Sequence, residues 1–552
     1  MTCFKSAFLL VGKKFFAHSP RSNESKSGIM PKNNETDGSA VNITTTSSVS
    51  SSPLDMRAKD TETESTPNSN GRPELPKFIP TGHSGRTLVL CFDGTGDQFD
   101  MDNSNVIAFF TMLKKGDNDN QMVYYQAGIG TYFAPQVATP RASKFSKLLD
   151  EAIAWNLHAH LMDGYEFLMQ NYKADDRICI FGFSRGAYTA RALAGMLHKV
   201  GLLPACNHQQ VPFAYKMYTN TSEKGWKQAN AFKKAFSIDV PIEFLGVWDT
   251  VNSVGLIPRW LPFTASNTIV RTFRHAISLD ERRAKFKTNL WNTPTPAKLT
   301  SETEDQNQAN QHKAHDRPTE ELELLIAMER KYSDFSNRQT DVEEVPRSLN
   351  VWFAGCHCDI GGGSVDNDTA HALARIPLRW MVRECFKANT GIMFDTDGLR
   401  GIGLDPHAIY PVVQPRPPPL STTNMRIQTA RDPEADIGEH GASISTQPLS
   451  EEDHELRDAL SPIYDQLTLA RFWWVLEFIP FRQMYGKGDN TVKFTFRWNK
   501  GAGRVIPKQD HIVKVHRTVK MRMEATHCDG GKYEPKAHFH EALKSGNLRW
   551  VD

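Results

Sequence analysis

One short motif in the sequence could hold a catalytic serine. Gly182-Phe183-Ser184-Arg185-Gly186 follows the apolar run 178–181 and precedes the alanine-rich stretch 187–199, which predicts a strand, a sharp turn and a helix. Glycine two residues before and two residues after the serine lets strand and helix approach without Cβ clashes. We therefore expect Ser184 to be a nucleophile exposed at the turn. The backbone amide of Arg185, at the helix N-terminus, is expected to help hold an oxyanion.

Alternating strands and helices predict the sheet that would position this serine. Apolar runs typical of buried strands lie at 87–92, 122–125, 178–181, 242–248 and 349–354. Helical patterns lie at 105–115, 148–172, 187–199 and 369–387. This order predicts an α/β fold of the α/β-hydrolase kind, with a doubly wound, mostly parallel sheet and helices on both faces.

Two further residues with suitable chemistry follow predicted strands. Asp249 comes directly after the run 242–248, and His357 follows the run 349–354. Ligands of open α/β sheets bind beyond the carboxyl ends of the strands, and serine, aspartate, histidine is the chain order of α/β-hydrolase triads. Asp249 could instead cap a turn, and His357 could be an exposed residue of a glycine-rich turn. His275 is the rival base, but its surroundings look helical, which favours a packing role.

The turn after the first strand offers a second oxyanion donor. Asp93-Gly94-Thr95 resembles a turn of haloacid dehalogenase-type phosphotransferases, but Cys91 stands where their nucleophilic aspartate would be. A phosphoaspartate mechanism therefore lacks its nucleophile. We expect instead that the amide of Gly94 or Thr95 faces the oxyanion, as in hydrolases.

Composition excludes several classes of function. The formal net charge of the 552 residues is +2, which argues against a nucleic-acid binder. Cys356 and Cys358 flank His357, but no second pair lies at metal-ligand spacing, so we expect neither a metal site nor a cofactor. Scattered cysteines and the lack of a long apolar run favour an intracellular, cytoplasmic protein. The basic start of the chain, residues 1–22, leaves an organellar presequence as an alternative.

The composition also divides the chain. We expect a disordered Ser/Thr-rich leader at 1–84, a catalytic domain at 85–410 with a polar insert at 294–318, a Pro-rich polar linker at 411–449, and a C-terminal segment at 450–552 that packs on or extends the domain.

The C-terminal segment contains the aromatic residues Phe472, Trp473, Trp474 and Phe478 in an apolar run, 472–481, that is flanked by arginines. Such a run could contact a membrane surface or cover an acyl pocket, although packing in the core is the simpler expectation. His516, in an alternating stretch, is expected to be a surface or structural residue.

Six blocks of the sequence, taken in order, resemble the type VI secretion phospholipase effector (Tle)-like α/β-hydrolases. They are 90–95, 126–131, 182–187, 246–251, 275–282 and 353–363. The resemblance implies phospholipid ester hydrolysis by a triad of Ser184, Asp249 and His357. The leader and the polar insert look more like the fungal members, for which the resemblance implies the fold but not the substrate. We therefore expect a serine hydrolase of carboxylic esters, with lipids or phospholipids preferred. The alternative is a catalytically silent scaffold: a protein that has the hydrolase fold but no activity and binds lipid or a protein partner.

Overall fold

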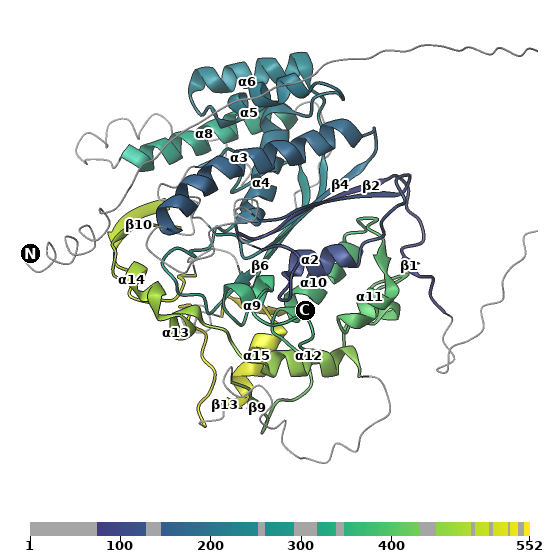
Figure 1. Ribbon diagram of the computed structural model, residues 1–552, viewed down its shortest axis with the longest axis vertical. Coiled ribbons are helices and arrows are strands. Elements are labelled where there is room, and N and C mark those ends of the chain that lie inside the picture. The colour runs from purple at the N-terminus through teal and green to yellow at the C-terminus, as the bar shows by residue number, and fades with distance from the viewer. Residues whose placement is uncertain are drawn as a thin grey trace, which may run out of the picture. The chain divides into compact units, whose positions relative to one another are not determined.

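The computed structural model describes residues 74–95, 97–128, 145–251, 260–291, 317–337, 347–429, 449–486, 492–506, 512–527, 530–538 and 546–552 (Figure 1). These residues all belong to one compact unit, 66–552. The leader up to residue 73, the polar insert up to residue 316 and the linker at 430–448 lie outside the described residues.

The strands are β1 (Phe78–Ile79), β2 (Thr87–Phe92), β3 (Gln121–Gln126), β4 (Arg177–Phe183), β5 (Ile242–Trp248), β6 (Val270–Ser278), β7 (Arg347–Phe353), β8 (Phe394–Asp395), β9 (Arg426–Ile427), β10 (Phe481–Gly486), β11 (Val492–Arg497), β12 (Val513–His516), β13 (Thr526–His527) and β14 (Leu548–Val551). The helices are α2 (Asn105–Thr111), α3 (Phe145–Asn171), α4 (Ser184–Val200), α5 (Val211–Thr219), α6 (Glu223–Phe236), α8 (Arg317–Asn337), α9 (His357–Gly361), α10 (Arg375–Lys387), α11 (Thr396–Gly401), α12 (Glu451–Leu460), α13 (Gln466–Leu469), α14 (Trp474–Glu477) and α15 (Arg517–Glu524), with short 3₁₀ turns at His208–Gln210, Pro406–Ala408 and Arg471–Trp473.

The central sheet has eight strands in the order β14-β12-β7-β6-β5-β4-β2-β3, and every neighbouring pair is parallel. The inner strands β2, β4 and β5 read as nearly continuous apolar runs because both faces of the sheet are covered there. In β2, Leu88 and Leu90 pack in one core cluster, whereas Val89 and Cys91 pack in another. The α/β-hydrolase-like, doubly wound architecture is therefore confirmed.

Helices cover both faces of this sheet (Figure 1). The cluster that holds Leu88 and Leu90 also contains residues of α3, α4, α5 and α6. The opposite cluster contains residues of α2 and α10. The two layers fix the sheet between them, so the carboxyl ends of its strands form a stable edge for a site.

The expectation of a helix around His275 is wrong, because this residue lies on β6 in the middle of the sheet. The strand carries Arg271 and Arg274, whose charges interrupt the apolar pattern of a buried strand. Both arginines have carboxylate partners, Glu243 and Glu384. Solvent exposure of Arg271 and the ion pair of Arg274 with Glu384 therefore let a strand with two charges enter the sheet, which the local pattern does not reveal.

The C-terminal segment supplies two strands of the central sheet. β12 pairs with β7, and β14 pairs with β12 at the sheet edge. His516 ends β12, where its ring stacks on Phe353 and its side chain accepts a hydrogen bond from the amide of Thr518 at the start of α15. His516 is buried, so it is a structural residue and not a surface one.

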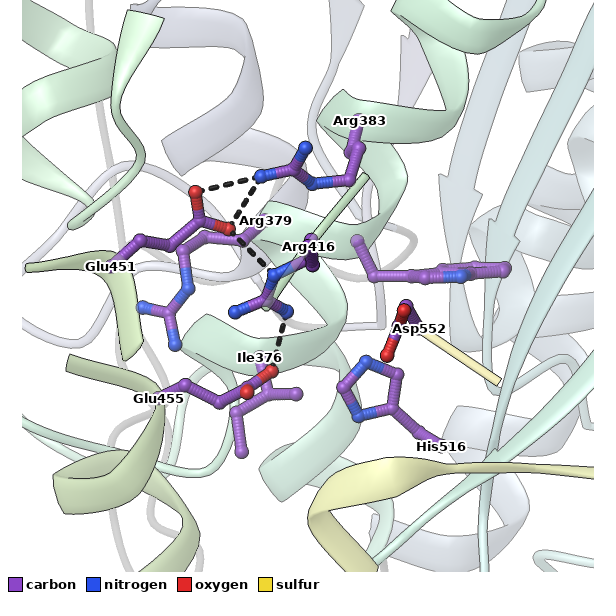
Figure 2. A pocket seen from close by; sticks show the side chains of 9 residues that line it. Ile376, Arg379, Arg383, Arg416, Glu451, Glu455, His516 and Asp552 are labelled. Atoms are coloured by element: carbon purple, nitrogen blue, oxygen red, sulfur yellow. Dashed lines mark hydrogen bonds and ion pairs between the residues drawn. The ribbon is translucent and has the colours of Figure 1, made fainter. Parts of the chain in front are cut away.

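Two segments expected to be polar leader or linker join the ordered unit. Residues 78 and 79, inside the leader expected at 1–84, pair with β8 as strand β1. Arg416, inside the linker expected at 411–449, is largely buried and forms ion pairs with Glu451 and Glu455 of α12 (Figure 2). Arg383 of α10 pairs with the same Glu451. The network surrounds a cavity of about 10 Å³, which has room for one water at most.

Candidate active site

Ser184 lies at the junction of β4 and α4, where the chain turns sharply. Its backbone φ is 57°, a left-handed value that an L-residue adopts at some cost. A Cβ on Gly182 would lie 2.6 Å from the carbonyl oxygen of Gly186, and a Cβ on Gly186 would lie 2.3 Å from that of Phe92. Both glycines are therefore required for strand and helix to approach, as the motif predicted.

The structure brings together the three residues that the sequence singled out from three different strand ends. His357 Nε2 lies 2.8 Å from Ser184 Oγ, and His357 Nδ1 lies 2.6 Å from Asp249 Oδ2. All three side chains are buried, so the expectation that Ser184 is exposed at the turn is wrong. With a proton on Nδ1, shared with the carboxylate, Nε2 is left as an acceptor for the serine hydroxyl.

Arg504 holds the carboxylate of Asp249 from the other side. Its guanidinium nitrogens lie 2.6 and 2.9 Å from the two Asp249 oxygens, and they also donate to the carbonyl oxygens of Ser278 and Phe286. The Ser278 amide donates a further hydrogen bond to Asp249, at 3.0 Å. Burial alone would raise the pKa of Asp249, but the Arg504 charge and the hydrogen bonds from His357 and Arg504 hold it well below its ordinary value.

No sequence signal points to Arg504. It lies 255 residues from Asp249 in the chain, in the loop after β11, and the glycines just before it, Gly501 and Gly503, do not form a motif that names a partner for an arginine. Only the folding of the C-terminal segment onto the sheet brings the two together.

His357 is the first residue of the short helix α9 and is enclosed by aromatic rings. Phe183 and Phe286 lie 4.7 and 4.9 Å from its ring, measured between centroids. Its backbone amide donates to Glu281, at 3.3 Å, and Glu281 is paired with Arg283. Burial lowers the pKa of His357, and the hydrogen bond and charge of Asp249 offset only part of this effect. The imidazole is thus held neutral, as a proton acceptor must be.

His275, the rival base, has other partners. Its Nε2 accepts a hydrogen bond from the amide of Thr250, at 3.0 Å, and its Nδ1 lies 3.3 Å from the side-chain oxygen of Asn350. Burial lowers the pKa of His275 to about 3, so the ring stays neutral. His275 therefore supports the turn that follows Asp249 rather than facing Ser184.

The turn after β2 is fixed by Asp93. Its carboxylate accepts hydrogen bonds from Ser104, Tyr125 and the amide of Gly94, the last at 2.8 Å. Because the Gly94 amide is engaged there, Thr95 is left as the candidate from this turn. The Arg185 amide lies in the first turn of α4, directly after Ser184.

The cysteines that the structure describes have the surroundings of structural residues. Within the described ranges, no group of three or more His, Cys, Asp or Glu side chains is placed to hold a metal ion. The thiol of Cys356 donates to the carbonyl of Asp280, and burial raises the pKa of Cys91, Cys356 and Cys358. These are the properties of structural rather than reactive thiols.

The aromatic run of the C-terminal segment does not fill the core. Phe472 and Phe478 are 59% and 61% exposed, so the expectation of core packing is wrong for these two residues. Trp473 contacts Phe286, with ring centroids 5.7 Å apart, and the Trp474 indole donates to a backbone carbonyl of α13. The run therefore lies beside the ring that covers His357.

Among the described helices, none has the length and apolar character needed to span a bilayer.

Similar chains are found among curated proteins and among solved structures. An uncharacterized Saccharomyces cerevisiae protein, YEL023C, is 28% identical over 81% of this chain and 80% of its own length. An uncharacterized Pseudomonas aeruginosa protein is 18% identical with a TM-score of 0.31, over 56% of this chain and 46% of that one. The Tle1 effector bound to the VgrG spike of the type 6 secretion system is 15% identical with a TM-score of 0.25, over 55% of this chain and 56% of that one.

This chain thus spans about half the length of each solved protein. The family model of the catalytic domain of Tle1-like phospholipase effectors of type VI secretion (T6SS) matches residues 86–384, more than half of the chain and the part that contains Ser184, Asp249 and His357. The chain belongs to the family of T6SS Tle1-like phospholipase effector catalytic domains.

Proposed function

We propose that this protein is a serine hydrolase that cleaves carboxylic esters of lipids, with phospholipids as the main substrate class. The observation that carries the proposal is the continuous hydrogen-bonded chain from Ser184 through His357 to Asp249. Membership of a phospholipase effector family supports a lipid ester as substrate.

Ser184 is the nucleophile in this mechanism. His357 Nε2 takes the hydroxyl proton while Oγ attacks the ester carbonyl carbon, and the carbonyl oxygen becomes an oxyanion. The bond from carbon to the leaving alcohol then breaks, and His357 returns the proton to that alcohol. Water repeats the sequence on the acyl-enzyme, which releases the fatty acid and restores Ser184. No cofactor enters any of these steps.

Asp249 and Arg504 keep the base in position. The Asp249 carboxylate fixes the proton on Nδ1 of His357 and stabilises the imidazolium that forms. Arg504 and the Ser278 amide hold the carboxylate itself, so it cannot rotate away from the histidine. The amides of Arg185 and Thr95 are assigned to the oxyanion, where loss of one donor costs roughly 100- to 1,000-fold in turnover.

The test is hydrolysis by the purified full chain. Phosphatidylcholine vesicles and a soluble short-chain ester are offered separately, and released fatty acid and alcohol are measured. We expect hydrolysis of both, and a loss of roughly 10⁶-fold in Ser184→Ala with an unchanged melting temperature. Vesicle binding without any hydrolysis by the intact protein would favour a silent scaffold instead.

A further inference from the structure

A group of apolar side chains lies exposed along α13, the 3₁₀ turn that follows it, α14 with the residues just after it, and the turn after β11. We name it the apolar rim: Leu469, Phe472, Val475, Phe478, Ile479 and Trp498. Each of its members is between 41% and 65% exposed. Isolated exposed apolar residues are normal on a protein, whereas a cluster of large ones marks a contact surface.

The rim is held in this orientation by a buried acid. Glu477 of α14 is 1% exposed and accepts hydrogen bonds from the amides of Ala284 and Gly501, at 2.6 and 2.9 Å, and from the side chain of Asn499. The short helix α14 turns its carboxylate inward and Val475 outward, and the exposed Phe472 and Phe478 lie on either side of it, which reverses the pattern of a water-facing helix. The outward orientation is thus built into the fold.

Basic residues border the apolar rim. Arg471, Arg497 and Lys500 are exposed, and the Lys500 ammonium lies 5.3 Å from the ring centroid of Trp498. The nearby acids have partners of their own: Glu477 is buried among amide donors, and Asp465 is paired with Arg282. Aromatic and aliphatic side chains with a cationic border match an interface that has an acyl interior and anionic headgroups.

The rim is close to the triad. Phe472 stacks on Trp473, at 5.0 Å between centroids, Trp473 meets Phe286 at 5.7 Å, and Phe286 meets His357 at 4.9 Å. The Arg283 guanidinium lies over both middle rings, 3.5 Å from Phe286 and 4.9 Å from Trp473. A lipid that leaves a bilayer at the rim would therefore reach the base after passing two aromatic rings.

We propose that the apolar rim docks the protein on a bilayer that contains anionic phospholipids, and that Trp473 and Phe286 lie along the path of the lipid to Ser184. The docking step stands on the exposed surface and its charge. The path to the serine rests on the proposed function.

The first experiment measures vesicle binding in the Ser184→Ala background, so that hydrolysis cannot change the membrane. Phe472→Ser/Phe478→Ser is compared with Phe213→Ser/Phe236→Ser, a control pair with similar exposure, 55% and 52%, on α5 and α6. We expect the rim pair to lower the partition coefficient on phosphatidylcholine–phosphatidylserine vesicles by about tenfold or more, with the melting temperature kept. The control pair should bind as the parent does.

The second experiment tests the charge of the border. Arg497→Gln/Lys500→Gln should lower binding to vesicles with phosphatidylserine by about fivefold for each charge, and should leave binding to pure phosphatidylcholine unchanged. Lys216→Gln/Lys224→Gln, exposed on α5 and α6, is the matched control and should have no effect.

Three results would overturn the docking proposal. The first is unchanged vesicle binding in the rim pair, and the second is an equal loss of vesicle binding in the rim and control pairs. The third is a dimer in solution that dissociates in the rim pair, because a second copy of the chain would then occupy the apolar rim. The proposed function fails separately: vesicle binding that depends on the rim, in a protein that hydrolyses no ester, would keep the docking surface and reject the hydrolase. With Ser184 intact, the rim pair should retain soluble-ester hydrolysis within about twofold while vesicle hydrolysis falls with binding.

Discussion

Replacing Arg504 by glutamine tests how the C-terminal segment contributes to the site. The guanidinium forms two charged hydrogen bonds to Asp249, at 2.6 and 2.9 Å, in a place where both side chains are buried. Arg504→Gln leaves the carboxylate with its bonds to His357 and the Ser278 amide. Removing one partner of such a buried pair costs about 3–5 kcal/mol of unfolding free energy. At roughly 2–4 °C per kcal/mol, the melting temperature should fall by about 10 °C.

The effect on catalysis follows from the same contacts. A carboxylate that is free to shift by about 1 Å misplaces the imidazole, and misplacement of this size costs on the order of 100-fold in kcat/KM. Removal of a nearby positive charge also raises the proton affinity of the pair formed by Asp249 and His357. Because His357 acts as a base only when neutral, activity is lost as the pH falls through its pKa. The acid limb of kcat/KM should therefore move upward in Arg504→Gln, by roughly one pH unit.

The assay is a pH profile of soluble-ester hydrolysis, recorded below the lowered melting temperature. Arg504→Lys keeps the charge but cannot form the paired contact, so it should restore the position of the acid limb better than the rate. An Arg504→Gln enzyme with unchanged rate and pH profile would refute the positioning role. A rate loss without any shift of the acid limb would reduce that role to general stability.

Further outcomes follow from the same geometry. His357→Ala should lower hydrolysis nearly as much as Ser184→Ala, and the double variant little further, because triad members act as a unit; greater loss in His275→Ala than in His357→Ala would reverse the assignment. The native protein should lose kcat/KM below an acid-limb midpoint under 6.5, since burial lowers the pKa of His357 from that value; a midpoint above 6.5 would contradict the burial argument. Gly186→Ala, whose new Cβ would lie 2.3 Å from two backbone oxygens, should lower the free energy of unfolding by about 1–3 kcal/mol and reduce the labelling of Ser184 by a fluorophosphonate. Gly82→Ala, with nothing within 4 Å of its new Cβ, should unfold as the parent does in denaturant titrations.

Local patterns singled out the three residues that the structure brings within hydrogen-bond distance of one another. Ser184 follows from the two glycines that its turn requires, and Asp249 and His357 follow from their places after apolar strands. Ser104 caps α2 with its side chain, as serine before an apolar stretch often does. These signals are local because strand, turn and cap chemistry act within a few residues.

The parts that sequence reasoning missed depend on distant partners. β6 contains two arginines, of which Arg271 is 49% exposed beside Glu243 of β5 and Arg274 is largely buried against Glu384 of α10. Arg504 contacts Asp249 from a position 255 residues further along the chain. Phe472 and Phe478 are exposed because Glu477, between them in the chain, is buried and accepts hydrogen bonds from backbone amides. A pattern of apolar residues cannot distinguish a core from a lipid-facing surface, since both exclude water.

The central claim is that Ser184 is an activated nucleophile, and covalent labelling tests it most directly. The folded protein is treated with a fluorophosphonate, which reacts with a serine whose proton a neighbouring base removes, and the modified peptide is identified by mass spectrometry. We predict one adduct per chain, on Ser184, and none in Ser184→Ala or His357→Ala. An adduct on another residue, or undiminished labelling of folded Ser184→Ala, would contradict the account.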